Sequence, residues 1–353
     1  MLRRIAAIAF AAAAFAGTIA WAGHELPIYP SYYPHEIDIQ AVPPERALEA
    51  IERGQIQAYI GAAPPPAALP ASVGTVESLG SFIVVTVKSG SPGDPCAVTA
   101  AAIEELAGQG RDVVFHPYPV TPFHGDYLYH ADLAAAAKEL WTSRIKTTRQ
   151  SQTRQGDAAV TAIDAGVLQA HAMAVVNGWI GPPWLRQGWF QADVLLGDAL
   201  IDPAAKTRSA ADFARLTTGD YDDAAERINL ERDLVELLSS GCQKTVAGYT
   251  VRRNYFNDDY SAGIENVAYD AISGFASPMF LRTAKLKDFP WNGWLELGTG
   301  ARPTAAWNPV AGFTDDFGRL MRSALGDPAV LPAPNDSGWT INRIADVTAT
   351  PVR

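Results

Sequence analysis

The stretch IDIQAVPPERALEAIERGQIQAYI, residues 37–60, decides the fold class that we expect for this chain. Its first five residues alternate between apolar and polar side chains, as in a half-buried strand. A proline pair then opens a helix that carries its apolar residues on one face and ends at Gly54. Residues 56–60 form a second strand. A strand, a helical crossover and a strand make a βαβ unit, so we expect parallel strands and a right-handed connection.

The segments that follow extend the α/β pattern. We predict strands over residues 81–87 and 113–115, helices over residues 96–106, 158–176 and 222–238, and a helix from residue 133 past residue 141 that Asp132 could cap. Residues 143–156 carry basic but no acidic side chains, which suits either a connection between lobes or a solvated helix end. We therefore predict an α/β fold with two lobes, residues 23–150 and 151–353, parallel or mixed sheets, and an irregular, aromatic-rich C-terminal part.

Residues 1–22 have the pattern of a cleaved secretory signal peptide. Arg3 and Arg4 precede an unbroken run of small and apolar residues, and the small-residue motif at residues 20–22 suits cleavage. The run is short for a membrane span, and no later segment is long enough and free enough of charge to be one. We therefore expect a periplasmic protein that is not embedded in the membrane.

Composition and charge limit the function classes. The chain is 48% hydrophobic and 19% charged, which excludes a disordered or collagen-like protein. Its formal net charge is −10, and nucleic acids need cationic patches on their partners, so we expect no nucleic-acid partner. The sequence contains no G-x-S-x-G elbow, P-loop or G-x-G-x-x-G motif, and neither cysteine has a histidine beside it in a nucleophile pattern. A binding function is therefore favoured over an enzyme.

The two cysteines, Cys96 and Cys242, are predicted to form one disulfide. An isolated pair in an exported chain is more often a disulfide than a redox or metal site. Such a bridge would close a loop of well over a hundred residues and restrict the unfolded chain.

Four consecutive segments, LPIYPSYYPHEIDIQ, PPERALEAIERG, QIQAYIGA and SFIVVTVKSGSP, resemble the opening of type 2 periplasmic substrate-binding proteins of ABC importers, especially the phosphonate-binding group. The resemblance covers residues 26–90. It implies a two-lobed fold, a ligand-facing aromatic loop after the first strand, and delivery of the ligand to an ABC transporter permease. The C-terminal third departs from the family's usual return crossover. A more distant similarity is to exported metal-uptake proteins of methylotrophs.

An aromatic and polar group near the start of the mature chain is our first candidate ligand site. Its rings can line a cleft while their polar tips orient a ligand. Packing of the tyrosines against the second half of the chain is the alternative. The candidate ligand-binding residues are Tyr29, Ser31, Tyr32, Tyr33, His35 and Glu36.

Histidine placement gives the second candidate site. Five of the six histidines fall within residues 24–130, and the densest group offers His116, His124, Asp126 and His130 as metal ligands. Imidazole and carboxylate suit Zn²⁺ or another first-row divalent cation, and intervening glycine and proline imply a loop that could gather them. The alternative is ordinary hydrogen bonding, because no compact spacing such as H-E-x-x-H is present. We predict that this group lines one wall of the main cleft, opposite residues 29–35.

Two acidic clusters, residues 220–223 and 257–260, offer the oxygen ligands that Ca²⁺ or a trivalent lanthanide prefers. Neither has the order of an EF-hand loop, and Asp222 and Asp223 more simply favour a helix N-terminus. Together these features predict an exported periplasmic protein that binds a small solute or metal ion and delivers it to an ABC transporter or partner protein. The alternative is a secreted metal-dependent hydrolase that uses the histidine cluster, which needs an open coordination position and a general base.

Overall fold

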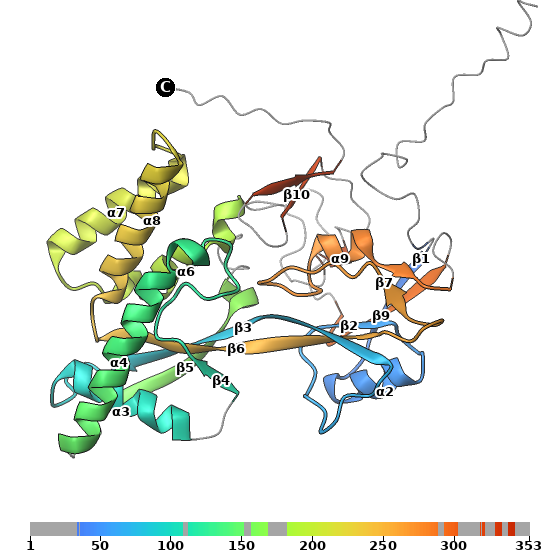
Figure 1. The fold of residues 1–353 in the computed structure, drawn as a ribbon, viewed down its shortest axis with the longest axis horizontal. Coiled ribbons are helices and arrows are strands. Elements are labelled where there is room, and N and C mark those ends of the chain that lie inside the picture. The colour runs from blue at the N-terminus through green and yellow to red at the C-terminus, as the bar shows by residue number, and fades with distance from the viewer. Residues whose placement is uncertain are drawn as a thin grey trace, which may run out of the picture.

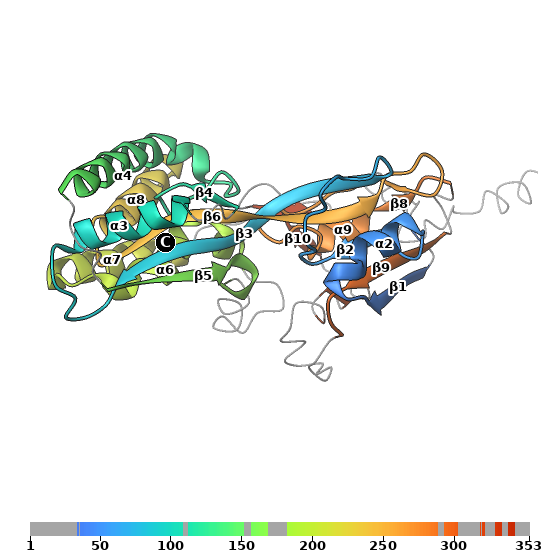
Figure 2. The same cartoon turned by 90° about the horizontal axis from the view of Figure 1, so that it is seen from below.

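Two long antiparallel strands, β3 (Val73–Val87) and β6 (Lys244–Asn257), run through the molecule and join its two ends (Figures 1 and 2). The computed structural model describes residues 34, 36–108, 112–151, 157–168, 182–288, 293–302, 318, 320–321, 329–333 and 338–342. Register shifts between Leu79 and Phe82 and between Ile83 and Val84 interrupt the β3–β6 ladder. These irregularities bend the strand pair near its middle, as bulges do.

The main sheet of the described residues is mixed. Its strand order is β1-β9-β2-β6-β3-β5, with β4 also paired to β6. β1 and β9 are parallel, as are β9 and β2, whereas β6 pairs antiparallel with β2, β3 and β4, and β5 pairs antiparallel with β3. The remaining strands of this sheet are β1 (Glu36–Ala41), β2 (Ala58–Ile60), β4 (Val113–Phe115), β5 (Ala158–Asp164) and β9 (Trp294–Thr299). The predicted α/β class with parallel or mixed sheets is confirmed.

The segment that decided the fold class forms β1, the 3₁₀ helix η1 (Pro44–Arg46), α2 (Ala47–Glu52) and β2. Ala47 and Ile51 are buried on the inner face of α2, and Gly54 has a φ of 67°, which suits glycine after a helix. β1 and β2 run parallel, as predicted, because both pair in parallel with β9. They are not neighbours, since β9 from the C-terminal part lies between them.

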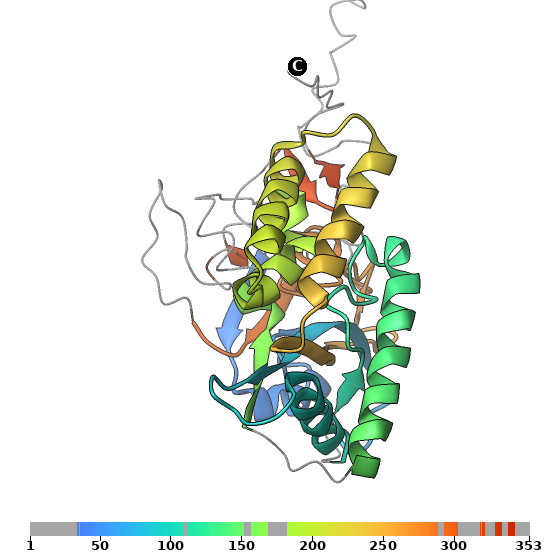
Figure 3. The same cartoon turned by 90° about the vertical axis from the view of Figure 1, so that its left-hand side faces the viewer.

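Helices gather at one end of the molecule, which Figure 3 views face on. Successive residues of β3 point to opposite faces of the sheet there. Phe82 and Val84 belong to a core that α6 and α8 cover, and Ile83 and Val85 belong to a core that α3 and α4 cover. These elements are α3 (Pro95–Gly108), η2 (Tyr127–Tyr129), α4 (Ala131–Ser151), η3 (Pro183–Arg186), α6 (Gly188–Leu196), η4 (Gly197–Ala199), α7 (Pro203–Thr218) and α8 (Ala224–Ser239).

The other end contains β1, α2, β2 and β9 together with a later segment that folds over them (Figure 1). That segment has β7 (Ile264–Glu265), α9 (Pro278–Thr283) and β8 (Lys285–Leu286), and a hairpin follows, β10 (Val330–Pro332) and β11 (Trp339–Ile341). Each end therefore draws on residues from before and after residue 150. The division of the chain into two lobes, residues 23–150 and 151–353, remains a prediction.

The predicted disulfide is confirmed. Cys96 at the start of α3 bonds to Cys242 before β6, with Cα atoms 4.9 Å apart. The bridge fastens α3 to the sheet across a sequence separation of 146 residues.

Two local expectations need correction, and for residues 143–156 the helix-end alternative is the one that the structure supports. Residues 158–164, predicted as helix, form the strand β5, because pairing with the buried β3 outweighs local propensity. α4 begins at Ala131, so Asp132 lies in its first turn and pairs with Arg232. α4 also runs to Ser151, which makes most of residues 143–156 the end of a helix. Within the described part of the chain, none of the helices combines the length and apolar character needed to cross a bilayer.

Candidate functional site

The segment between β4 and α4 carries the predicted histidine cluster. His116, His124, Asp126 and His130 are all buried. The loop approaches the start of α6 closely, since a Cβ atom on Gly188 would lie 2.5 Å from Val120 Cγ1. Glycine at this position therefore lets the helix N-terminus meet the loop.

His116 and His124 use their ring nitrogens within the surrounding structure. The Nε2 atom of His116 donates to the carbonyl oxygen of Val120 at 2.8 Å. His124 accepts from the Thr121 amide through Nδ1 at 2.9 Å, and its Nε2 donates to Gln191 Oε1 at 3.0 Å. These contacts match the hydrogen-bonding alternative for the two histidines, and burial lowers the pKa of His116.

Asp126 holds the N-terminus of α6. Its Oδ1 accepts from the Gly188 amide at 3.0 Å, and its Oδ2 accepts from the Trp189 amide at 3.3 Å. The free amides and the dipole at a helix start both favour a carboxylate there. The Asp126 side chain is thus fixed in place by the helix that it caps.

His130, which directly precedes α4, and Glu231 of α8 lie close to Asp126. The His130 Nδ1 atom lies 3.0 Å from the Tyr118 hydroxyl, and its Nε2 lies 4.0 Å from Asp126 Oδ2. Glu231 accepts from Arg227 through Oε1 at 2.6 Å. One ligand atom from each of Asp126, His130 and Glu231 lies within 4.8 Å of the others. We call these three residues the buried triad.

Burial governs protonation in the buried triad. It lowers the pKa of His130 below its ordinary value, although the negative Asp126 opposes the shift. Burial also raises the pKa of Glu231 to about 7, against the opposing attraction of Arg227. Burial similarly raises the pKa of the Tyr118 phenol, so this group remains a neutral hydroxyl. At neutral pH the triad therefore combines an uncharged imidazole with a carboxyl group near its midpoint of ionisation.

An open pocket reaches the buried triad from the surface. Its cavity volume is about 460 Å³. Asp126 and Glu231 both line it, and aromatic side chains form much of its wall. The full lining is Gly125, Asp126, Tyr129, Trp184, Gln187, Trp189, Leu216, Tyr221, Arg227, Glu231 and Gly338. Gly338 belongs to the C-terminal hairpin, so this pocket is bounded by elements from distant parts of the chain.

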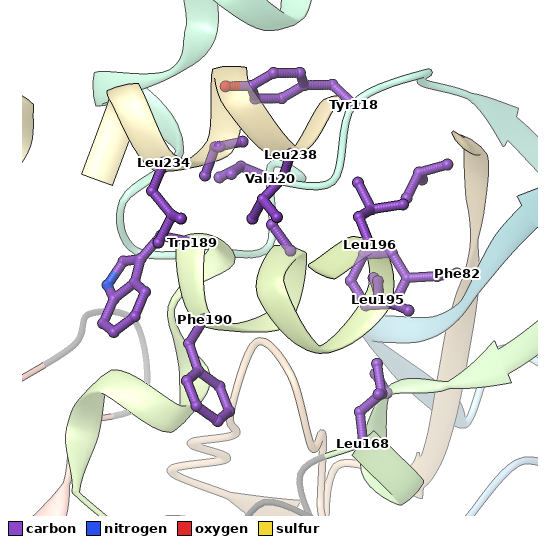
Figure 4. Close-up of a cluster of buried hydrophobic side chains, with 14 of the residues drawn as sticks. Phe82, Tyr118, Val120, Leu168, Trp189, Phe190, Leu195, Leu196, Leu234 and Leu238 are labelled. Carbon is purple, nitrogen blue, oxygen red and sulfur yellow. The ribbon is translucent and has the colours of Figure 1, made fainter. Parts of the chain in front are cut away.

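Part of the pocket wall belongs to a packed apolar core, because Trp189 and Leu216 both line the pocket and lie in this core. Trp189 and Leu234 lie in this core, beside α6 and α8, and Tyr118 lies at its edge (Figure 4). The tryptophan side of the pocket wall is therefore held by close packing. Rigid support of this kind favours a preformed binding site.

The sequence prediction located two members of the triad and missed the third. Asp126 and His130 were among the candidate metal ligands, whereas Glu231 was assigned only to a predicted helix. The helical periodicity could have identified Glu231 as buried, because it falls on the same face of the helix as Leu234, Val235 and Leu238. A carboxylate in an apolar stripe indicates a buried charge with a specific role.

Of the six candidate residues near the start of the mature chain, Glu36 falls within the part that the structure describes. Tyr29, Ser31, Tyr32, Tyr33 and His35 lie outside the described residues, as does the predicted signal peptide at residues 1–22. Glu36 begins β1, at the opposite end of the molecule from α8 (Figure 1). The predicted arrangement of residues 29–35 opposite the histidines therefore stays a prediction.

The acidic clusters have local structural roles. Asp223 is the N-cap of α8 and accepts from the Glu226 amide at 2.8 Å. Asp259 accepts from the amides of Ser261 and Ala262, both at 3.0 Å. The expected preference of Asp223 for a helix N-terminus is confirmed.

Comparison with known proteins identifies no family. No family model matches the chain, and no curated protein matches it. Two solved structures are similar to part of the chain. OppA from Haemophilus influenzae, in complex with the peptide RPPGFSPFR, has a TM-score of 0.36 and 12% identity over 69% of this chain and 56% of its own. HbpA2 from Haemophilus parasuis has a TM-score of 0.38 and 8% identity over 68% of this chain and 55% of its own.

This chain therefore spans about half the length of either solved structure. At these TM-scores the likeness carries no argument about activity, ligand or partner.

Proposed function

We propose that this protein is an exported binding protein that holds a small solute or metal ion in the pocket above the buried triad. In this proposal it delivers the ligand to an ABC transporter permease or to another partner protein in the periplasm. The observation that carries the proposal is the pocket itself, with aromatic side chains on its wall and two buried carboxyl groups at its floor. Ligand sites commonly combine an apolar wall with a few convergent polar groups.

The chemistry of the pocket favours a ligand with positive charge. Asp126 and Glu231 line it, and Arg227 provides one guanidinium that Glu231 already engages. Trp184, Trp189 and two tyrosines supply ring faces, which attract cations. An amine-bearing solute or a metal ion could contact both the carboxyl groups and the aromatic rings.

The helical end and the opposite end are joined by β3 and β6, and the C-terminal hairpin contributes Gly338 to the pocket rim (Figure 1). Export rests on the signal-peptide pattern of residues 1–22.

A metal-dependent hydrolase is the second candidate. The convergence of Asp126, His130 and Glu231 favours it, since catalytic zinc sites have three protein ligands. Only two of the four predicted metal ligands, Asp126 and His130, lie in this group. His116 and His124 instead form hydrogen bonds to Val120 and Gln191. Turnover of phosphate or carboxylic ester substrates by the metal-loaded protein, absent in a Glu231→Gln variant, would favour the hydrolase over the binding protein.

The binding function is tested with the mature, untagged protein after treatment with EDTA. A thermal-shift screen of polyamines, basic amino acids and short basic peptides should identify a solute that raises Tm. Replacement of Tyr221 by alanine should weaken the binding of that solute by about fivefold to thirtyfold, since a ring at a cation site supplies about 1–2 kcal/mol. Tyr260→Ala is the matched control, because Tyr260 is 94% exposed and lies outside the pocket. No solute that raises Tm, or equal affinity in the Tyr221 and Tyr260 variants, would contradict the proposal.

A further inference from the structure

We infer that Asp126, His130 and Glu231 form a binding site for one divalent first-row transition cation, such as Zn²⁺, at the floor of the pocket. This inference rests on the proposed function in taking the pocket as the route by which the ion arrives. It also specifies that the bound species includes a metal ion. The side chains that hold this ion include Glu231 and do not include His116 or His124.

The geometry brings three suitable ligand atoms together. His130 Nε2 and Asp126 Oδ2 are 4.0 Å apart, and all three ligand atoms lie within 4.8 Å of one another. Zinc bonds to nitrogen and oxygen ligands are about 2.0–2.2 Å long, which places tetrahedral ligand atoms roughly 3.4 Å apart. Closure around an ion therefore needs side-chain shifts of about an ångström.

Two polar atoms of the triad lack a partner among the described residues. These atoms are His130 Nε2 and Glu231 Oε2. Their residues are 0% and 1% exposed, so water at the surface does not solvate them freely. A buried polar group without a partner costs free energy, and more so when it is charged. A cation between His130, Glu231 and Asp126 would supply the missing partner to both atoms.

The surrounding residues already fix each ligand in place. The Tyr118 hydroxyl contacts His130 Nδ1, which leaves Nε2 directed at Asp126 and available for an ion. The amides at the start of α6 hold Asp126, and Arg227 holds the other oxygen of Glu231. Outer groups that orient metal ligands in this way are typical of metal sites.

The donor set selects among metals. One imidazole and two carboxylates suit Zn²⁺, Co²⁺ and Mn²⁺. Ca²⁺ binds six to eight oxygen atoms. The group found among the described residues has only two carboxylates and one imidazole, so it does not suit Ca²⁺. Asp126 and Glu231 line the pocket whereas His130 does not, so the pocket side is where water or a donor atom of a solute would complete the coordination.

The test uses the untagged mature protein, stripped with EDTA and dialysed, with Co²⁺ as a spectroscopic probe and Zn²⁺ in calorimetry at pH 7.5. The inference predicts one ion per chain and visible Co²⁺ bands of a site with nitrogen and oxygen ligands. Glu231→Gln should weaken the binding of the ion by at least about tenfold. Loss of a group that only orients a metal ligand already lowers metal affinity by about tenfold to a hundredfold, and Glu231 is a proposed ligand itself. Glu236→Gln is the matched control, because it removes the same charge from an exposed position of α8.

His130→Gln provides an independent second variant, in case Glu231→Gln perturbs the fold, and circular dichroism checks both. No ion bound to the wild type, or equal affinities of the wild type and both triad variants, would overturn the inference. The two proposals fail separately. A solute that binds the EDTA-treated protein in a Tyr221-dependent manner, without any metal affinity, would overturn the cation site and leave the binding function standing.

Discussion

Replacement of Glu231 by glutamine should stabilise the metal-free protein, and the gain should grow with pH. Glutamine has a similar size and keeps an oxygen for the Arg227 bond, which is 2.6 Å long in the wild type. The substitution therefore removes one buried negative charge and leaves the packing of α8 in place. Buried charges are costly unless they are fully paired, and Glu231 has one oxygen without a partner among the described residues.

The magnitude follows from the pKa of Glu231. Burial raises this pKa from 4.5 in the unfolded chain to about 7 in the folded protein. The folded state thus holds more protons than the unfolded state between these values, so its stability falls as pH rises through this window. The difference of about 2.5 pH units, at about 1.4 kcal/mol for each, amounts to roughly 3 kcal/mol when the folded carboxyl is fully ionised. The neighbouring His130 has the opposite sign, because its lowered pKa costs stability as pH falls.

The assay is urea unfolding followed by tryptophan fluorescence in EDTA, at pH 4.5, 6 and 8. The free-energy difference between Glu231→Gln and the wild type should be near zero at pH 4.5 and reach roughly 3 kcal/mol in favour of the variant at pH 8. The His130 contribution is present in both proteins and largely cancels in this difference. Glu236→Gln should give a flat difference, since Glu236 is exposed. A flat difference for Glu231→Gln as well would refute the assignment of a buried, weakly paired carboxyl group.

Three further outcomes are expected. Replacing Cys96 and Cys242 by serine should cost about 2–5 kcal/mol in urea unfolding, because the bridge closes a loop across 146 residues, and an unchanged midpoint would count against this role. Asp270→Asn should cost about 3–5 kcal/mol, because the Arg186 side chain is only 8% exposed and would lose its charged partner inside the protein, whereas Arg227, at 25% exposure, is partly solvated when Glu231 is replaced. Glu104→Gln, at the largely exposed pair with Arg149, should cost less than about 1 kcal/mol, and equal losses in the Asp270 and Glu104 variants would contradict the distinction. Zn²⁺ at a hundredfold excess over its Kd should stabilise the wild type by about 2.7 kcal/mol, and a Tm that does not move under those conditions would argue against folded-state binding.

Local patterns predicted the elements that are defined by nearby residues. The alternation in residues 37–41 and the proline-started helix identified β1 and α2, and the apolar run at residues 81–87 identified the buried half of β3. The even number of cysteines in an exported chain predicted the disulfide. Each of these signals depends on periodicity, capping or compartment, which the sequence carries directly.

Features that depend on distant partners were missed. β9 enters the sheet between β1 and β2, although it follows them by more than two hundred residues, and no local pattern shows such an insertion. Residues 158–164 became a strand only because β3 offers an edge for pairing. Glu231 reaches Asp126 and His130 through the packing of α8 against the loop, which spacing along the chain does not encode. Sequence reasoning therefore found the loop that carries the site but not the residue that completes it.

The most direct test of the account is a crystal structure of the protein soaked with Zn²⁺, with anomalous data collected on both sides of the zinc absorption edge. The account predicts one strong anomalous peak within about 2.2 Å of His130 Nε2 and of carboxylate oxygens from Asp126 and Glu231. A zinc-saturated crystal whose anomalous peaks lie only elsewhere, with the triad side chains unmoved, would contradict it.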